Sequence, residues 1–270
     1  MKPILESPII TDICDMTANM YRLGWDERNG GNISWLLDEG ELADYLDLSK
    51  TIRNIPIDFD AAELAGRLFL VTGTGKYFKN VTKDPEGNLG IVRVAPNGRE
   101  LELLWGFEGN TLPTSEFPTH LMNHMARLKA DPEHKVVMHC HPANTIAMTF
   151  VHSIDDRDFT CTLWQMITEC IVVFPDGVGV VPWMVSGTND IGAATADKIK
   201  DCRLVVWAHH GIFGTGRTLD EAFGLIETVE KAAEIYMKIA HLERKNEIPK
   251  DQLKALADTF HAVPREGWLD

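Results

Sequence analysis

The sequence lacks the features that would mark a disulfide framework or a nucleic-acid surface. Its five cysteines are odd in number, widely scattered and never in CxxC spacing, which suits a reducing compartment better than cross-links. Lys and Arg number 26 against 40 Asp and Glu, giving a formal net charge of −14. A surface of that sign gives no electrostatic reason to approach nucleic acid or anionic lipid. An anionic ligand must therefore bind at a local site.

Long apolar runs, repeats and linkers are also absent. No uninterrupted apolar stretch reaches the roughly 18–20 residues that span a bilayer, and the opening MKPILESPII lacks the apolar region of a signal peptide. We therefore expect a cytoplasmic protein with no membrane partner. Hydrophobic residues form 44% of the chain and charged residues 24%, as in ordinary globular proteins. Without an internal repeat or linker, residues 1–270 are predicted to form one domain.

Apolar periodicity and turn residues predict a mixture of helices and strands. Residues 11–24 place apolar side chains on one helical stripe that ends near Gly24, and Asn97-Gly98 between two apolar runs predicts a hairpin over 90–106. Other predicted helices span 114–130, 143–150, 188–200 and 219–244; strands span 31–37, 67–76, 135–141 and 202–211, with a strand pair over 169–183 and a mixed, acidic excursion over 38–66. This order favours a layered α/β or α+β architecture.

Histidines at strand ends form a candidate metal site. His139 and His141 form an HxH pair, and the period of two places both imidazoles on the same face of a strand. Alone, such a pair is as well explained by two hydrogen-bonded strand histidines. His210 follows the apolar run LVVWA at a second strand end, although the adjacent His209 competes with it. Three neutral imidazoles with an open position are what a catalytic zinc or similar ion requires.

Glu116 is a candidate general acid/base. It lies in LPTSEFP, where two prolines restrict the backbone at a loop-to-helix transition and can present the carboxylate inward. A glutamate in a first helical turn is more often explained by the helix dipole alone. Beside an ion held by histidines, a positioned carboxylate supplies the missing acid/base.

Three backbone-rich segments are candidate phosphate sites: the turn NGGN (29–32), the turn TGTGK (72–76) and the pair Thr114-Ser115. Glycines let the main chain approach an anion, and Asn, Thr and Ser add neutral donors. Each turn alone can simply reverse the chain. The spacing of TGTGK is not that of a P-loop, so nucleotide binding is poorly supported.

Several segments together identify a family. They are GWDERNGGNIS, LFLVTGTGK, NLGIV, LWG, PTSEFPTH, VVMHCHPANTIA, TECIVVFPDGVG, VPWMVSGTNDIG and AHHGIFGTGRTLDEAFGLIETVEK. On these segments the sequence resembles the class II aldolase/adducin family over nearly the full chain. The resemblance implies a single-domain α/β fold with a central, mainly antiparallel β-sheet covered by helices. It also implies a cyclic homotetramer with active sites at the subunit interfaces.

The resemblance implies roles for particular residues. His139, His141 and His210 would bind one Zn²⁺ per subunit, and Glu116 would be the catalytic acid/base. Glu169 would be a carboxylate that assists from the neighbouring subunit. The positions that match phosphate-binding ones are Asn29, Asn32, Thr74, Gly75, Thr114 and Ser115. Thr74 stands where the family pattern more often has Ser, and both supply a hydroxyl. Residues 38–66 match less well, and no role is carried onto them.

The implied reaction is cleavage of a ketose 1-phosphate, a small sugar phosphate, to dihydroxyacetone phosphate and L-lactaldehyde. The nearest alternatives are an aldolase for L-fuculose 1-phosphate and a pentulose-phosphate 4-epimerase, which releases no dihydroxyacetone phosphate. An adducin-like interaction module without activity is disfavoured by the presence of all three histidines and Glu116. A structural zinc domain is disfavoured because the candidate ligands include no clustered cysteines.

Overall fold

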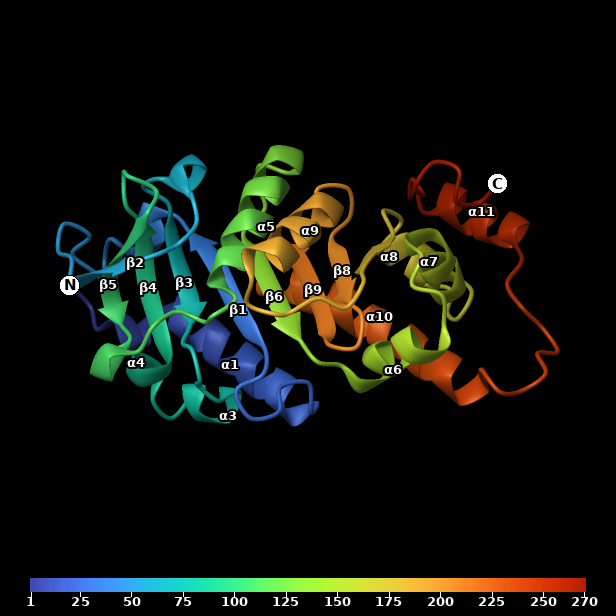
Figure 1. Ribbon diagram of the computed structural model, residues 1–270, viewed down its shortest axis with the longest axis horizontal. Helices are drawn as coiled ribbons and strands as arrows, with labels where there is room; N and C mark the ends of the chain where they lie inside the picture. The colour runs from blue at the N-terminus through green and yellow to red at the C-terminus, as the bar shows by residue number, and fades with distance from the viewer.

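The computed structural model describes residues 1–270 and is built on one nine-stranded β-sheet (Figure 1). The strand order is β2-β5-β4-β3-β1-β6-β9-β8-β7, and neighbours are antiparallel except for the parallel pair β7 and β8. The expected α/β fold with a central, mainly antiparallel sheet is confirmed. The strands are β1 (Asn32–Leu37), β2 (Arg53–Pro56), β3 (Leu68–Thr72), β4 (Leu89–Val94), β5 (Glu100–Gly106), β6 (Val136–Cys140), β7 (Val178–Val181), β8 (Leu204–Trp207) and β9 (Gly211–Gly216).

Helices cover both faces of the sheet, because central strands bury side chains on both sides. In β6, Val136 and Met138 belong to the larger core with α1 and α10, whereas Val137 packs with α9 on the opposite face beside α5. The helices are α1 (Pro8–Arg22), α2 (Glu39–Leu42), α3 (Phe78–Val81), α4 (Pro85–Asn88), α5 (Phe117–Ala130), α6 (Ala143–Val151), α7 (Asp156–Trp164), α8 (Cys170–Val173), α9 (Asn189–Ile199), α10 (Leu219–Ile239) and α11 (Lys250–Thr259). None of them is long and apolar enough to cross a membrane.

The strand register brings the candidate site segments together at the ends of the central strands β1, β6 and β9. Asn32, which begins β1, pairs with His139 near the end of β6, and His139 pairs with Phe213 of β9. The turn between β8 and β9 carries His209 and His210. Segments that are far apart in the sequence therefore meet where the central strands start and end.

Three of the sequence predictions need correction. Residues 169–183 hold only one strand, β7, because Cys170–Val173 forms helix α8, whose Cys170 and Ile171 are buried in the larger core. A short apolar run does not distinguish a strand from a buried helical turn. Residues 38–66 are not an excursion from the sheet, since β2 within them pairs with β5. The last predicted helix ends at Ile239 rather than at residue 244.

Candidate metal centre and active site

His139 presents an unpaired nitrogen to the centre of the site. It is fully buried in β6, and its Nδ1 lies 3.0 Å from the carbonyl oxygen of Ile212. A carbonyl only accepts, so Nδ1 carries the proton and Nε2 keeps its lone pair. Burial lowers the pKa of His139 well below its usual value, so the ring is neutral. Nε2 is buried without a hydrogen-bond partner, which is the state expected of a metal ligand.

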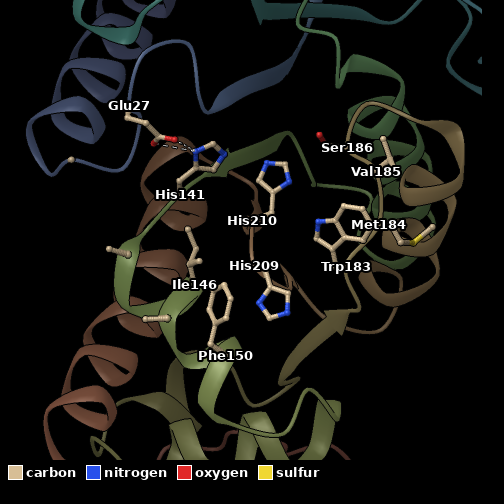
Figure 2. Close-up of a pocket in the computed structure, with 13 residues that line it drawn as sticks. Glu27, His141, Ile146, Phe150, Trp183, Met184, Val185, Ser186, His209 and His210 are labelled. Atoms are coloured by element: carbon tan, nitrogen blue, oxygen red, sulfur yellow. Dashed lines mark hydrogen bonds and ion pairs between the residues drawn. The ribbon is translucent and has the colours of Figure 1, made fainter.

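His141 is oriented by a carboxylate. It follows β6 directly, and its Nδ1 lies 3.0 and 3.1 Å from the two oxygens of Glu27 (Figure 2). Donation from Nδ1 to Glu27 leaves Nε2 free to bind a cation. Carboxylates that accept from the second nitrogen of a ligating histidine fix the ring and increase its basicity. Sequence reasoning did not assign this role to Glu27.

The turn between β8 and β9 separates the two neighbouring histidines. His210 turns toward the centre, and burial lowers its pKa to about 4. His209 has a φ of +64° and packs instead on Phe150, with ring centroids 4.1 Å apart (Figure 2). Its Nδ1 lies 3.2 Å from the hydroxyl of Thr149. The structure therefore brings His210, and not His209, into the cluster.

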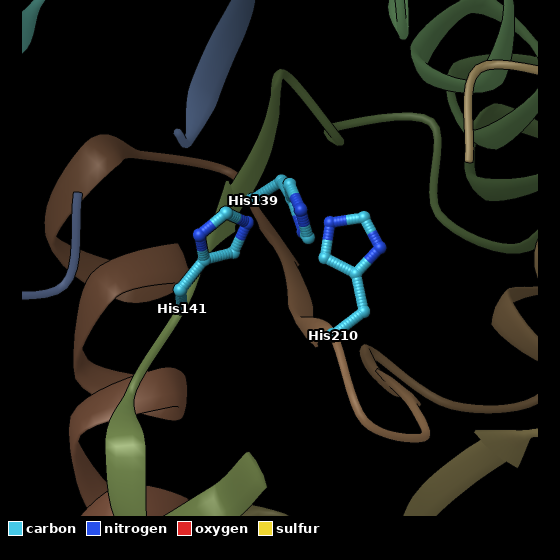
Figure 3. A group of neighbouring side chains, drawn as sticks. All are labelled: His139, His141 and His210. Carbon is cyan, nitrogen blue, oxygen red and sulfur yellow. The ribbon is translucent and has the colours of Figure 1, made fainter. Parts of the chain in front are cut away.

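The three rings of His139, His141 and His210 converge (Figure 3), with one ligand nitrogen of each lying within 4.8 Å of the others. Two come from the end of β6 and one from the β8–β9 turn. Three imidazoles, among them the buried, unpaired nitrogen of His139, fit a divalent ion such as zinc.

Glu116 lies beside this cluster at the start of α5. It is 8% exposed, and its Oε2 lies 3.6 Å from His139 Nε2 and accepts a 2.8 Å hydrogen bond from Asn32 Nδ2. Burial raises the pKa of Glu116, while the hydrogen bond from Asn32 and the proximity of His141 oppose this rise. A buried carboxyl group with a raised pKa next to a cation site suits proton exchange with a bound substrate.

A polar cavity of about 280 Å³ contains these groups. Its lining includes no hydrophobic residue, and it adds Arg28, a cation that sequence reasoning did not assign. Gly31 in its wall has a φ of +75°, and a Cβ there would lie 1.6 Å from the Asp26 carboxylate, so this turn needs glycine. Of the residues predicted for the site, the cavity is lined by Asn29, Asn32, Thr74, Gly75, Thr114, Ser115, Glu116, His139, His141 and His210.

A second, larger cavity of about 800 Å³ adjoins the first and is partly apolar. The two share Glu27, His141, Ser186 and His210. The apolar part is lined by Ile146, Phe150, Trp183, Met184 and Val185 (Figure 2). The site therefore offers a polar compartment and an apolar compartment on either side of the histidines.

Glu169 does not join these groups within one chain. It is exposed at the N-cap position of α8 and lines neither cavity. The structure of one chain therefore does not bring Glu169 into the site.

Comparisons with known proteins identify the family. A family model described as Class II Aldolase and Adducin N-terminal domain matches residues 11–237. A protein of Listeria innocua named rhamnulose-1-phosphate aldolase is 56% identical over 270 residues, covering 100% of this chain and 99% of that protein. One of the same name from Enterococcus faecalis is 55% identical, covering 99% and 96%.

A solved structure has the same fold. The crystal structure of a sugar-phosphate aldolase from Thermotoga maritima superposes with a TM-score of 0.75 at 30% identity, covering 88% of this chain and 97% of that one.

The fold and the site together define a metal-dependent enzyme rather than a structural metal domain, because three histidines and no cysteine converge beside a buried carboxyl group. The chain belongs to the class II aldolase/adducin family. It is a class II aldolase, a lyase of a metal-dependent family.

Proposed function

We propose that the chain reversibly cleaves L-rhamnulose 1-phosphate to dihydroxyacetone phosphate and L-lactaldehyde, a step of L-rhamnose breakdown. The observation that carries this proposal is full-length identity of 56% to a protein named rhamnulose-1-phosphate aldolase. The histidine cluster and Glu116 in one polar cavity supply the chemistry that such a cleavage needs.

His139, His141 and His210 would hold one Zn²⁺ per subunit. The unpaired Nε2 of His139 and the lowered pKa values of His139 and His210 support this assignment. When bound, the ion acts as a Lewis acid that stabilises negative charge on substrate oxygens, a contribution of several kcal/mol. Glu27 would hold His141 in the orientation that ligation needs.

Glu116 would exchange a proton with a substrate carbon. Cleavage breaks the C3–C4 bond, leaves the electron pair on C3 and removes the proton from the C4 hydroxyl, so C3 must be protonated. Glu116 is buried 3.6 Å from the metal-facing nitrogen of His139, with a raised pKa that favours delivery of a proton. Glu169 of a neighbouring copy would assist with the proton of the C4 oxygen.

The polar cavity would bind the phosphorylated end of the substrate. Its hydroxyls, amides and backbone N–H groups are neutral donors, and Arg28 adds positive charge in a protein of net charge −14. The groups proposed to contact the phosphate are Asn29, Asn32, Thr74, Gly75, Thr114 and Ser115. The apolar cavity on the other side of the histidines suits the methyl end of a deoxy sugar.

We also propose that the chain acts as a homotetramer. Phe150 and Trp183 are each 66% exposed and Val185 is 61% exposed at the mouth of the site. Large apolar side chains gathered on a surface usually contact another protein. The exposed Glu169 would then reach the site of a neighbour.

Residues 1–270 are proposed to act as one domain, which the continuous nine-stranded sheet supports. The five cysteines are all free, which favours a reducing, cytoplasmic location.

The test is a product assay. Purified, zinc-loaded protein is incubated with L-rhamnulose 1-phosphate, with and without a chelator, and dihydroxyacetone phosphate is detected by NADH consumption through a coupled dehydrogenase. Chelator-sensitive product is expected, at a higher kcat/KM than with L-fuculose 1-phosphate. A preference for the second sugar would change the assigned substrate, and the absence of product from either sugar would contradict the proposed cleavage.

A further inference from the structure

A chain of hydrogen bonds leads from Glu116 into the interior along α5. Glu116, His120 and His124 are spaced four residues apart, so they lie on one stripe of the helix. Asn32 and Ser34 are two residues apart in β1, so both point to the α5 face of the sheet. Along this series of hydrogen bonds, side chains from α5 alternate with side chains from β1.

The contacts are short and the residues are buried. Ser34 Oγ lies 2.7 Å from His120 Nδ1 and 2.8 Å from His124 Nε2, and His124 Nδ1 lies 2.9 Å from His134 Nε2. His120 Nε2 bonds to Asn32 Oδ1. Ser34, His120 and His124 are 0% exposed, and His134 is 2% exposed.

When Glu116 is ionised, its carboxylate accepts the bond from the Asn32 amide N–H, and this fixes the direction of donation. Asn32 Oδ1 is then the acceptor, so His120 must donate from Nε2. Burial lowers the pKa of His120 to about 3, so the ring is neutral and its Nδ1 carries no proton. Ser34 must therefore donate its only proton to His120.

The hydrogen bonds beyond Ser34 run in the same direction. Ser34 has no proton left for His124, so His124 donates from Nε2 to Ser34. Burial keeps the pKa of His124 well below its usual value, so its Nδ1 accepts from His134 Nε2. Every donor in the chain points toward Glu116, and all three histidines carry their proton on Nε2.

We propose that Ser34, His120, His124 and His134 are positioning residues that hold the Asn32 amide with its NH₂ toward Glu116. If the amide turned over, Asn32 Oδ1 would face Glu116 Oε2, and His120 Nε2–H would face an NH₂ group. Both pairs are mismatched, so a fixed His120 proton allows one amide orientation. The network orients the Asn32 amide but does not carry protons to Glu116, because an amide group passes on no proton. This role rests on the proposed function of Glu116.

The proton positions can be observed without substrate. Neutron diffraction from crystals of the full-length protein near neutral pH is expected to place a single proton, on Nε2, in His120, His124 and His134. A proton on Nδ1 of His120 would overturn the proposal. This measurement holds whatever sugar phosphate the enzyme cleaves, so it separates failure of this inference from failure of the assigned substrate.

Kinetics test the consequence for Glu116. Ser34→Ala removes one oxygen and is expected to lower kcat roughly tenfold, the scale of one hydrogen bond to a charged group. KM should rise less, because other groups of the polar cavity also hold the phosphate, and zinc content should be unchanged. His120→Phe should match this loss, whereas His120→Gln, which keeps an N–H donor, should recover most of it.

The control is Leu121→Ala, a fully buried neighbour on α5 that makes no contact in the chain of hydrogen bonds. It should lower stability and leave kcat near the wild-type value. Wild-type kcat in Ser34→Ala, or an equal loss in Leu121→Ala, would overturn the positioning role. If Ser34→Ala does not fold, the two His120 variants test the role. A kcat in His120→Gln as low as that in His120→Phe would overturn it.

Discussion

The protein contains two groups of three histidines, and the two groups differ in what their ring nitrogens contact. The metal-site group is His139, His141 and His210, and the α5 group is His120, His124 and His134. Burial lowers pKa values in both groups. In the α5 group, the lone pairs of His120 and His124 accept hydrogen bonds, whereas in the metal-site group a fully buried lone pair on His139 accepts nothing. A lowered pKa therefore marks burial, and an unpaired nitrogen marks a ligand.

The largest expected effect comes from breaking the metal-site group. His141→Ala should lose zinc and lower the cleavage rate to that of the chelated enzyme, at least about 10³-fold, because several kcal/mol of charge stabilisation are lost. His134→Gln in the α5 group is the matched control and should retain zinc. Elemental analysis measures the metal in both variants, and full occupancy in His141→Ala would refute its role as a ligand.

Glu116→Gln should leave the metal in place and remove the acid/base. The amide is nearly isosteric with the carboxyl group, so zinc content should equal that of the wild type. Turnover should fall by roughly 10² to 10⁴, the range typical of a lost general acid/base. The coupled assay measures this loss, and turnover close to the wild-type value would remove Glu116 from the mechanism.

Glu27→Gln should have a smaller effect, on metal affinity rather than on chemistry. Loss of the carboxylate that accepts from His141 Nδ1 should weaken zinc binding about 10- to 100-fold. At saturating zinc, kcat should stay near the wild-type value. Competition with a chromophoric chelator measures the affinity, and the exposed Glu63, changed to Gln, provides the control. Unchanged affinity in Glu27→Gln would show that this contact does not support the metal.

The sequence predicted the metal-site group because its signals are local. An HxH pair in a strand places both imidazoles on one face, and the segments around it identify the family. Strand β9, which follows His210, was harder to predict, since three of the six residues of GIFGTG are glycine, which is depleted in strands. Gly211 is required there because a Cβ would lie 2.4 Å from the carbonyl oxygen of Cys140. Close packing against β6 therefore overrides local propensity in β9.

The contacts around the site could not be predicted, because they join segments far apart in the chain. Glu27 and His141 are 114 positions apart, and Asn32 and Glu116 are 84 apart. The α5 group did leave a local signal, since Glu116, His120 and His124 share one helical stripe. That stripe becomes informative only when Ser34 of β1 is known to lie between the two histidines.

The smallest expected effect is on the acid stability that one histidine of the α5 group confers. Burial lowers the pKa of His134 from 6.5 to about 3. Between these values the unfolded chain binds a proton that the folded chain does not, so the unfolded state gains stability as the pH falls below 6.5. The contribution of His134 to stability is complete well above pH 6.5 and is lost as the pH falls toward about 3. The loss between pH 6.5 and pH 5.5 is about 1 kcal/mol.

Glutamine at this position does not titrate and can still donate to His124. With metal removed from both proteins, the free energy of unfolding of His134→Gln should therefore fall less steeply between pH 6.5 and pH 5.5 than that of the wild type. Denaturant titrations at each pH measure the two slopes. Equal slopes would mean that His134 titrates in the folded protein as it does in the unfolded chain, which would contradict its lowered pKa and its burial as a neutral ring.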